Sequence, residues 1–227
     1  MTTSTATASR PGQLGQFGFD PVARHRHVAL PSGMVFVIGL SGVSAEKTGA
    51  AQARYNRASD ATAAALAAWN DHTGRADRSP AAAVRSAEDA PATLSRILEP
   101  ELATRVEHFV RESEVLVPAA ADALAAADLA AFGAVAAESQ HLTETLLGNQ
   151  VPETIALAAT ARELGAVAAS AFGAGFGGSV WALVARADAD AFASDWLARH
   201  RAAFPHRVQA DTLVTDAAAA AQRVQRP

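Results

Sequence analysis

The chain has 227 residues, of which 50% are hydrophobic and 19% are charged, so it can bury the core of one domain or of one domain with part of another. Its 19 basic and 23 acidic side chains give a formal net charge of −4, which excludes a basic field for nucleic acid. It contains no cysteine, which excludes disulfides, thiolate metal sites and cysteine nucleophiles.

The N-terminal residues lack a basic cluster followed by an apolar stretch, so they do not form a secretory signal. We expect residues 1–10 to be a flexible leader. The most apolar long stretch, residues 117–137, is mostly alanine and is interrupted by Asp122 and Asp128, which predicts a packed helix and no membrane span. We therefore expect a cytoplasmic protein.

Three runs with the character of strands follow the leader, at residues 16–19, 27–30 and 34–40. Pro31-Ser32-Gly33 supplies a turn before the third run. The third run is apolar on both faces, which predicts a strand covered on both sides.

A long helical region comes next and is rich in alanine. The predicted helices span residues 45–70, a short segment opened by Ser79-Pro80, two or three segments within 92–147 with breaks at Pro118 and Asp128, and 151–165. The pattern then changes to strands at residues 167–172 and 179–184, a helix at 188–200, and strands at 206–210 and 212–214. This order predicts an α+β fold with an antiparallel sheet at the end of the chain.

The most distinctive motif is the loop between the strands predicted at 167–172 and 179–184. It consists of Gly173, Ala174, Gly175, Phe176, Gly177 and Gly178. It matches the glycine spacing of a dinucleotide-binding loop, but a strand follows where that site requires a helix, so this reading fails. A hairpin needs one or two glycines, and the excess predicts that the loop lies against a phosphate, a sugar or a second loop; the alternative is a structural hairpin packed on a neighbouring backbone.

The segment from Gly165 to Ser179, with Ser170-Ala171-Phe172 before the loop, resembles the third conserved motif of the GHMP kinases, close to T-G-A-G-F-G-G-C in galactokinases. Phe172 and Ser179 replace the threonine and the cysteine. The resemblance covers roughly residues 10–215 and includes Phe132-Gly133, Ser139-Gln140-His141-Leu142 and Val151-Pro152-Glu153, which we interpret as structural helix segments. It implies that the loop lies beside the nucleotide phosphates and the acceptor pocket.

Tyr55, in the segment Tyr55-Asn56-Arg57, resembles a galactokinase tyrosine that contacts the bound sugar. The resemblance therefore implies that Tyr55 is a substrate-binding residue; without it, a helix tyrosine with its ring in the core would be favoured. Lys47-Thr48 fails the P-loop pattern because Glu46 and Ser41 occupy glycine positions. Arg24-His25-Arg26-His27 is predicted to be an edge strand, and no metal site is expected.

The family's phosphate loop, its early sugar-binding stretch and its catalytic aspartate have no counterpart in this sequence. We therefore expect a leader at 1–10, remnant strands of the N-terminal kinase domain at 11–40, a GHMP kinase C-terminal domain with a ferredoxin-like antiparallel sheet and several helices at 41–216, and a tail at 217–227. The catalytic residues are unknown. The chain alone is expected to be inactive and to bind no cofactor tightly.

The resemblance implies the C-terminal part of an ATP-dependent sugar kinase, which phosphorylates galactose or a related sugar at its anomeric hydroxyl and needs Mg²⁺ in its complete form. Its expected partners are the sugar, ATP and the missing N-terminal half, with no nucleic acid and no membrane. The alternatives are a non-catalytic sugar-binding or regulatory module, and another GHMP kinase such as an arabinokinase or a heptose kinase.

Overall fold

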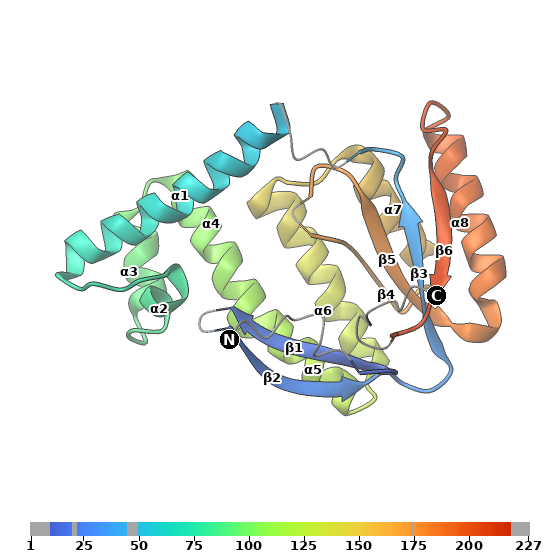
Figure 1. Cartoon of the computed structure of the whole chain (residues 1–227), viewed down its shortest axis with the longest axis horizontal. Coiled ribbons are helices and arrows are strands. Elements are labelled where there is room, and N and C mark those ends of the chain that lie inside the picture. The colour runs from blue at the N-terminus through green and yellow to red at the C-terminus, as the bar shows by residue number, and fades with distance from the viewer. Residues whose placement is uncertain (1–9, 20–21, 45–49, 174, 219–227) are drawn as a thin grey trace, which may run out of the picture.

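The computed structural model describes residues 10–19, 22–44, 50–173 and 175–218, without the side chains of Phe19 and of residues 50–59. Within this part, two antiparallel sheets combine with a series of helices (Figure 1). The α+β class and the antiparallel sheet are therefore confirmed. No described helix is both long enough and apolar enough to cross a membrane.

A hairpin of β1 (Gln13–Phe19) and β2 (Val22–Ala29) forms the first sheet. Both strands are longer than the runs predicted from the sequence. Arg26 of β2 joins the hairpin to the helices, because its guanidinium donates to Asp122 at 2.6 Å and to the Pro118 carbonyl at 2.9 Å. The cluster Arg24–His27 lies in β2 as predicted, and no group of three metal-ligating side chains occurs among the described residues.

The second sheet has the strand order β4-β5-β3-β6 and is antiparallel throughout. Its strands are β3 (Met34–Leu40), β4 (Ala168–Ala171), β5 (Ser179–Ala185) and β6 (Asp211–Thr215). The domain boundary predicted at residue 40 stays a prediction. The structure shows that β3, on the N-terminal side of that boundary, is hydrogen-bonded between β5 and β6.

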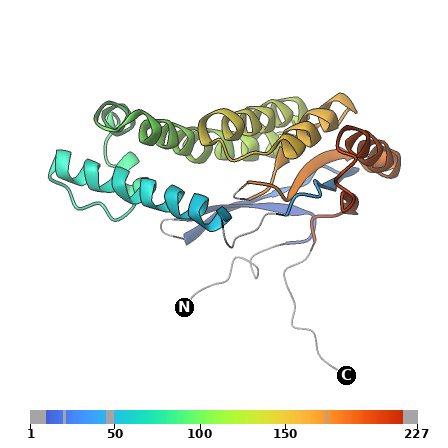
Figure 2. The ribbon, with the colours of Figure 1, turned by 90° about the horizontal axis from the view of Figure 1, so that it is seen from above.

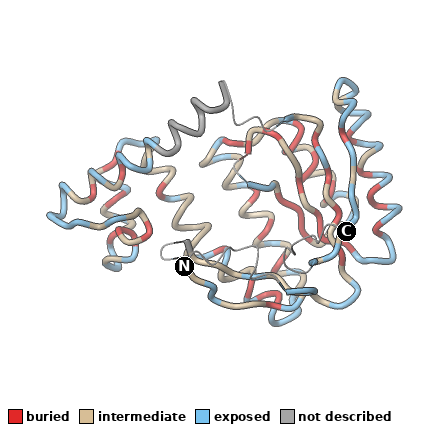
Figure 3. The backbone as a smooth tube through the Cα atoms, in the orientation of Figure 1, coloured by how far each residue is buried: buried red, intermediate tan, exposed pale blue. Residues whose placement is uncertain are grey.

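The period of two in β3 divides the core between the two faces of this sheet. Val35 and Val37 pack with α7 (Pro152–Glu163) and α8 (Ala189–Ala203), around the fully buried Trp196. Met34 and Phe36 face the other core, with α5 (Val117–Ala125), α6 (Leu129–Leu142) and the β1–β2 hairpin. Figure 3 shows the buried residues concentrated in the sheet and the helices beside it.

A third core joins the helices between the two strand regions. It includes the buried side chains of Trp69, Leu94 and Val106, from α1 (Ala50–Thr73), α3 (Ala90–Ile97) and α4 (Pro100–Val110). The short helix α2 (Pro80–Val84) begins as the Ser79-Pro80 pattern predicts, with the Ser79 hydroxyl accepting from the Ala82 N–H at 3.1 Å. Seen from above, the helices of residues 90–163 form one layer over the hairpin strands (Figure 2).

Of the two helix breaks predicted at Pro118 and Asp128, the structure has only the second. Pro118 does not interrupt the helix, because α4 continues through a π-helical turn, η2 (Arg111–Leu116), into α5. In that turn the Val117 N–H donates to the Glu112 carbonyl five residues back, and Pro118 follows in the first turn of α5, where a missing N–H is tolerated. The break at Asp128 is confirmed, since its carboxylate caps α6 by accepting from the Ala131 N–H at 2.9 Å.

The predicted strand at 206–210 is wrong, because this segment forms successive turns between α8 and β6. The N–H of Arg207 donates to the Phe204 carbonyl at 2.9 Å, and the N–H of Ala210 donates to the Arg207 carbonyl at 3.0 Å. These local hydrogen bonds use the backbone groups that a strand would offer to a neighbour.

Candidate active-site loop

The glycine loop lies where β4 turns back into β5, as the sequence predicts. The N–H of Phe172 donates to the Ser179 carbonyl at 3.0 Å and closes the hairpin at its base. The backbone is left-handed at Gly173, Gly175, Gly177, Gly178 and also at Phe176. Because side chains disfavour this conformation, the path of the loop itself favours glycine at four positions, while Phe176 adopts it with its side chain. Ala174 lies outside the described residues.

The middle of the loop packs against the backbone that precedes α7. The N–H of Phe176 donates to the Asn149 carbonyl. A Cβ atom on Gly175 would fall on the same carbonyl oxygen and 2.7 Å from the Asn149 side-chain carbon Cγ. Gly175 therefore serves the close approach of two chain segments, as expected for the structural alternative of a hairpin packed on a neighbouring backbone.

The end of the loop is held by the segment that follows β3. The hydroxyl and the N–H of Ser41 both donate to the Gly178 carbonyl, at 2.7 and 2.9 Å, and the Gly178 N–H donates to the Val43 carbonyl at 2.8 Å. A Cβ atom on Gly177 would lie 2.9 Å from that same Val43 oxygen. Gly173 differs from these residues, because a Cβ atom there would meet nothing within 4 Å among the described residues. The start of the loop is thus its open part.

Tyr55 lies in α1, but its side chain is outside the described residues, so its predicted contact with an acceptor stays a prediction. Lys47 also lies outside them. Sequence reasoning missed the polar residues that hold the loop, namely Ser41, Asn149 and Gln140. Gln140 alone carried a signal, since it continues the buried positions Phe132 and Ala136 at a spacing of four along α6.

An ion pair connects the start of α7, close to Asn149, with the turn segment 204–210. Glu153, in the first turn of α7, is buried and accepts from the Arg207 guanidinium at 2.6 Å. Burial raises the pKa of Glu153, but hydrogen bonds from its own backbone N–H and from Arg207, together with the Arg207 charge, outweigh burial and leave the pKa below its usual range. His200 is also buried, with Nε2 3.1 Å from the Ser41 carbonyl.

This arrangement predicts a loss of stability in acid. Because the folded-state pKa of Glu153 is lowered, its contribution is complete above the unfolded pKa of about 4.3 and disappears as the pH falls through the folded value. We expect the difference in free energy of unfolding between the natural chain and a Glu153→Gln variant to shrink as the pH falls below about 4.3. Urea unfolding at pH 7, 5 and 3 checks this; a constant difference would contradict it.

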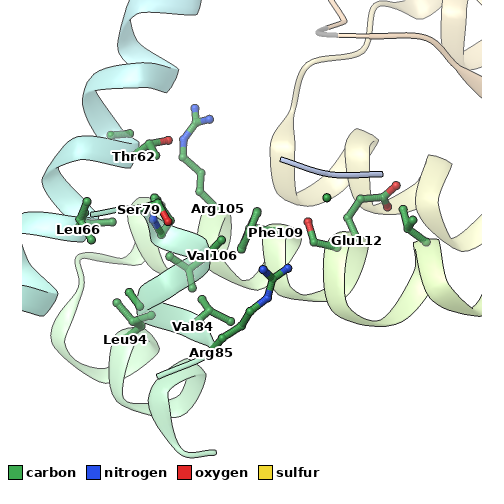
Figure 4. Close-up of a pocket in the computed structure, with 18 of the residues that line it drawn as sticks. Thr62, Leu66, Ser79, Val84, Arg85, Leu94, Arg105, Val106, Phe109 and Glu112 are labelled. Carbon is green, nitrogen blue, oxygen red and sulfur yellow. The ribbon is translucent and has the colours of Figure 1, made fainter. Parts of the chain in front are cut away.

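A cavity of about 560 Å³ lies between the helices α1–α4 and the tip of the β1–β2 hairpin. Figure 4 shows Arg105, Phe109 and Glu112 following one another along one wall, opposite Thr62 and Leu66 of α1. None of the described loop residues lines it. A second cavity, of about 200 Å³, shares Glu112 and Val117 with the first.

This second cavity extends toward the start of the glycine loop. Its lining includes Ser139 of α6, Trp181 of β5, and Ser170 and Ala171 at the end of β4. Because they share lining residues, the two cavities together extend from the helices α1–α4 to the end of β4, where the glycine loop begins.

Comparison with known proteins relates part of the chain to one family. Residues 120–202 match the family model described as GHMP kinases C terminal, and this segment contains α6, α7, the glycine loop and most of α8. This segment is therefore similar to the C-terminal domain of the GHMP kinases, which are phosphotransferases. No curated protein matches the sequence.

Among solved structures, galactokinase of Lactococcus lactis in complex with galactose is similar, with a TM-score of 0.75 and 23% identity over 91% of this chain and 51% of that one. Mevalonate kinase of L. major in complex with R-mevalonate gives a TM-score of 0.50 and 16% identity over 92% and 50%. At these identities the likeness concerns the fold. The chain spans about half the length of either kinase.

Proposed function

We propose that this chain forms one wall of the active site of an ATP-dependent sugar kinase. The observation that carries the proposal is the glycine loop, which is held firmly at its middle and its end while its start at Gly173 faces open space. The N–H groups of Phe176 and Gly178 already donate to Asn149 and Val43, so the part of the loop that can face an anion is its start at Gly173, since backbone N–H groups in a turn can point toward an anion. ATP phosphates are the ligands proposed for it, and the match to the GHMP family supports this assignment.

The rest of the active site comes from a second half of the kinase. Phosphoryl transfer needs a cradle for the phosphates, Mg²⁺ and a group that orients the acceptor hydroxyl, and the sequence offers neither the family's phosphate loop nor its aspartate. We propose that the chain alone is inactive and binds neither ATP nor Mg²⁺ tightly. A cytoplasmic location remains part of this proposal.

The acceptor is galactose or a related sugar, phosphorylated at its anomeric hydroxyl. Tyr55 is the proposed sugar contact, on the strength of its Tyr-Asn-x-Arg context. The similarity in fold to a galactokinase solved with galactose supports a sugar, without selecting one. An arabinokinase or heptose kinase shares the same chemistry with a different acceptor.

The test compares the isolated chain with the assembly that copurifies with the tagged chain from its source cells. Both are given ATP, Mg²⁺ and a panel of sugars, and sugar phosphate is measured. We expect product from the assembly and none from the isolated chain. Turnover by the isolated chain would contradict its inactivity, and sugar binding without turnover in either sample would favour a non-catalytic module.

A pair of matched variants tests the loop within the active assembly. Gly173 and Gly165 both have left-handed backbones with no described atom within 4 Å of the place that a Cβ atom would take, but only Gly173 belongs to the loop. We expect Gly173→Ala to lower turnover about tenfold, equivalent to about 1.4 kcal/mol of transition-state stabilisation, and Gly165→Ala to leave it unchanged. Equal activities would remove the loop from the phosphate site.

A further inference from the structure

The start of the glycine loop is attached to an edge strand whose open side is covered by side chains. Among the described strands, β4 pairs only with β5. Two flanking helices supply hydrogen bonds to its other edge: Gln140 of α6 accepts from the Ala171 N–H at 2.8 Å, and Arg162 of α7 donates to the Ala169 carbonyl at 3.3 Å. Backbone groups that a further strand would use are thereby satisfied.

Gln140 makes three hydrogen bonds with its side chain while it is only 1% exposed. Besides the Ala171 N–H, its Oε1 accepts from the Ser170 hydroxyl at 3.1 Å. Its Nε2 donates to Glu144 Oε1 at 2.7 Å, which fixes the orientation of the amide. Its two partners on β4, Ser170 and Ala171, are the last residues of that strand and come directly before Phe172 and the loop.

The same segment also holds the middle of the loop. After α6 the chain passes through a π-helical turn, η3 (Thr143–Leu147), to Gly148 and then to Asn149. Asn149 accepts from the Phe176 N–H and packs against Gly175. One continuous segment, 140–149, therefore contacts the end of β4 just before the loop and also the middle of the loop. The π-helical turn lies between these two contacts and sets their spacing.

We propose that Gln140 is a positioning residue for the phosphate-facing part of the glycine loop, and that Glu144 orients it. Gln140 acts through Ala171 and touches no substrate. It fixes the point from which Gly173 departs, while Asn149 fixes the point to which the chain returns at Gly175 and Phe176. This inference rests on the proposed kinase function for its consequence, but the positioning itself is a property of this chain.

The test exploits the complementary amides and carboxylates of this pair. Gln140→Leu removes all three hydrogen bonds, and Gln140→Glu places a second carboxylate against Glu144. The exchanged pair Gln140→Glu with Glu144→Gln restores every partner: the new carboxylate accepts from Ala171 and Ser170, and the new amide donates to it. Phe192→Leu, on the buried face of α8, serves as a control that lowers stability without contacting the loop.

Amide hydrogen exchange of the full chain, followed by NMR, is the readout. We expect Gln140→Leu and Gln140→Glu to speed exchange at Ala171 and Phe176 about tenfold more than at Val37 of β3, and the exchanged pair to restore most of the protection. Phe192→Leu should change these amides and Val37 by the same factor. Equal acceleration of Ala171 and Val37 by Gln140→Leu, or no recovery in the exchanged pair, would overturn the proposal.

The sugar-kinase assay on the purified assembly separates this inference from the function on which it rests. We expect Gln140→Leu to raise the KM for ATP about tenfold and the exchanged pair to bring it back. If exchange responds as expected and no assembly phosphorylates a sugar, the positioning role stands and the kinase function fails. An active assembly with an unchanged KM in the Gln140→Leu variant would overturn the positioning role in catalysis.

Discussion

Replacing Gly175 with alanine is expected to lower the free energy of unfolding by about 2–5 kcal/mol, because two penalties add. The first is the left-handed backbone, with φ at +80°, which costs a residue with a Cβ about 1–2 kcal/mol. The second is steric, because the new methyl group would fall on the Asn149 carbonyl oxygen, which cannot withdraw without breaking its hydrogen bond from Phe176. Urea denaturation followed by circular dichroism measures the loss.

Gly173→Ala is the matched control for this substitution. It carries the same backbone penalty, at φ +63°, but its methyl group would meet no described atom within 4 Å. We expect it to cost about 1–2 kcal/mol, so the difference between the two variants isolates the contact with Asn149. Equal losses would show that the loop has room at Gly175 and that its close packing against Asn149 is wrong.

Trp196→Ala is expected to cost about 3–5 kcal/mol, as is typical when a large buried aromatic side chain is removed. The indole is fully buried between α7, α8 and β3, and its Nε1 donates to the Leu157 carbonyl at 3.0 Å. It also lies against Gly39, where a Cβ atom would come within 2.8 Å of the ring. Thermal and urea unfolding of the isolated chain check the effect.

Trp196→Phe divides this cost between packing and hydrogen bonding. Phenylalanine keeps most of the buried area but leaves the Leu157 carbonyl without its donor, so we expect a loss of about 1–3 kcal/mol. Val208→Ala, at a side chain that is 81% exposed, should stay within about 0.5 kcal/mol of the natural chain. A Trp196→Ala variant as stable as Val208→Ala would refute the assignment of this core.

Local patterns were sufficient to predict most of the secondary structure. The strand at 34–40, the helix opened by Ser79-Pro80, the cap at Asp128 and the helix after Val151 follow from short-range rules for propensity, capping and turns. The wrong prediction of a strand comes from competing turn hydrogen bonds, which the strand-like residues alone do not reveal. Residues 206–210 have strand character, but Pro205 and the hydrogen bonds of Phe204, Arg207 and Ala210 favour turns.

The position of the candidate site in the chain was predictable, but the residues that contact the glycine loop were not. Four glycines between two strands indicate a special loop, yet they do not say which segment it lies against. Asn149, Ser41 and Val43 reach the loop only through tertiary contacts between distant parts of the chain. Gln140 gave a local hint, since a polar residue on a buried helix face requires partners, but those partners could be named only from the fold.

The place of β3 in its sheet has a consequence for how the protein is made. Both neighbours of this strand follow it at a long distance in sequence: Leu40 pairs with Ser179 on one side and with Asp211 on the other. The apolar strand cannot be paired until almost the whole domain has been synthesised, so contacts of high sequence separation must form last. At about 5–20 residues per second, the ribosome needs roughly 10 s or longer to add the strands that pair with β3, and during that time β3 has no strand partner.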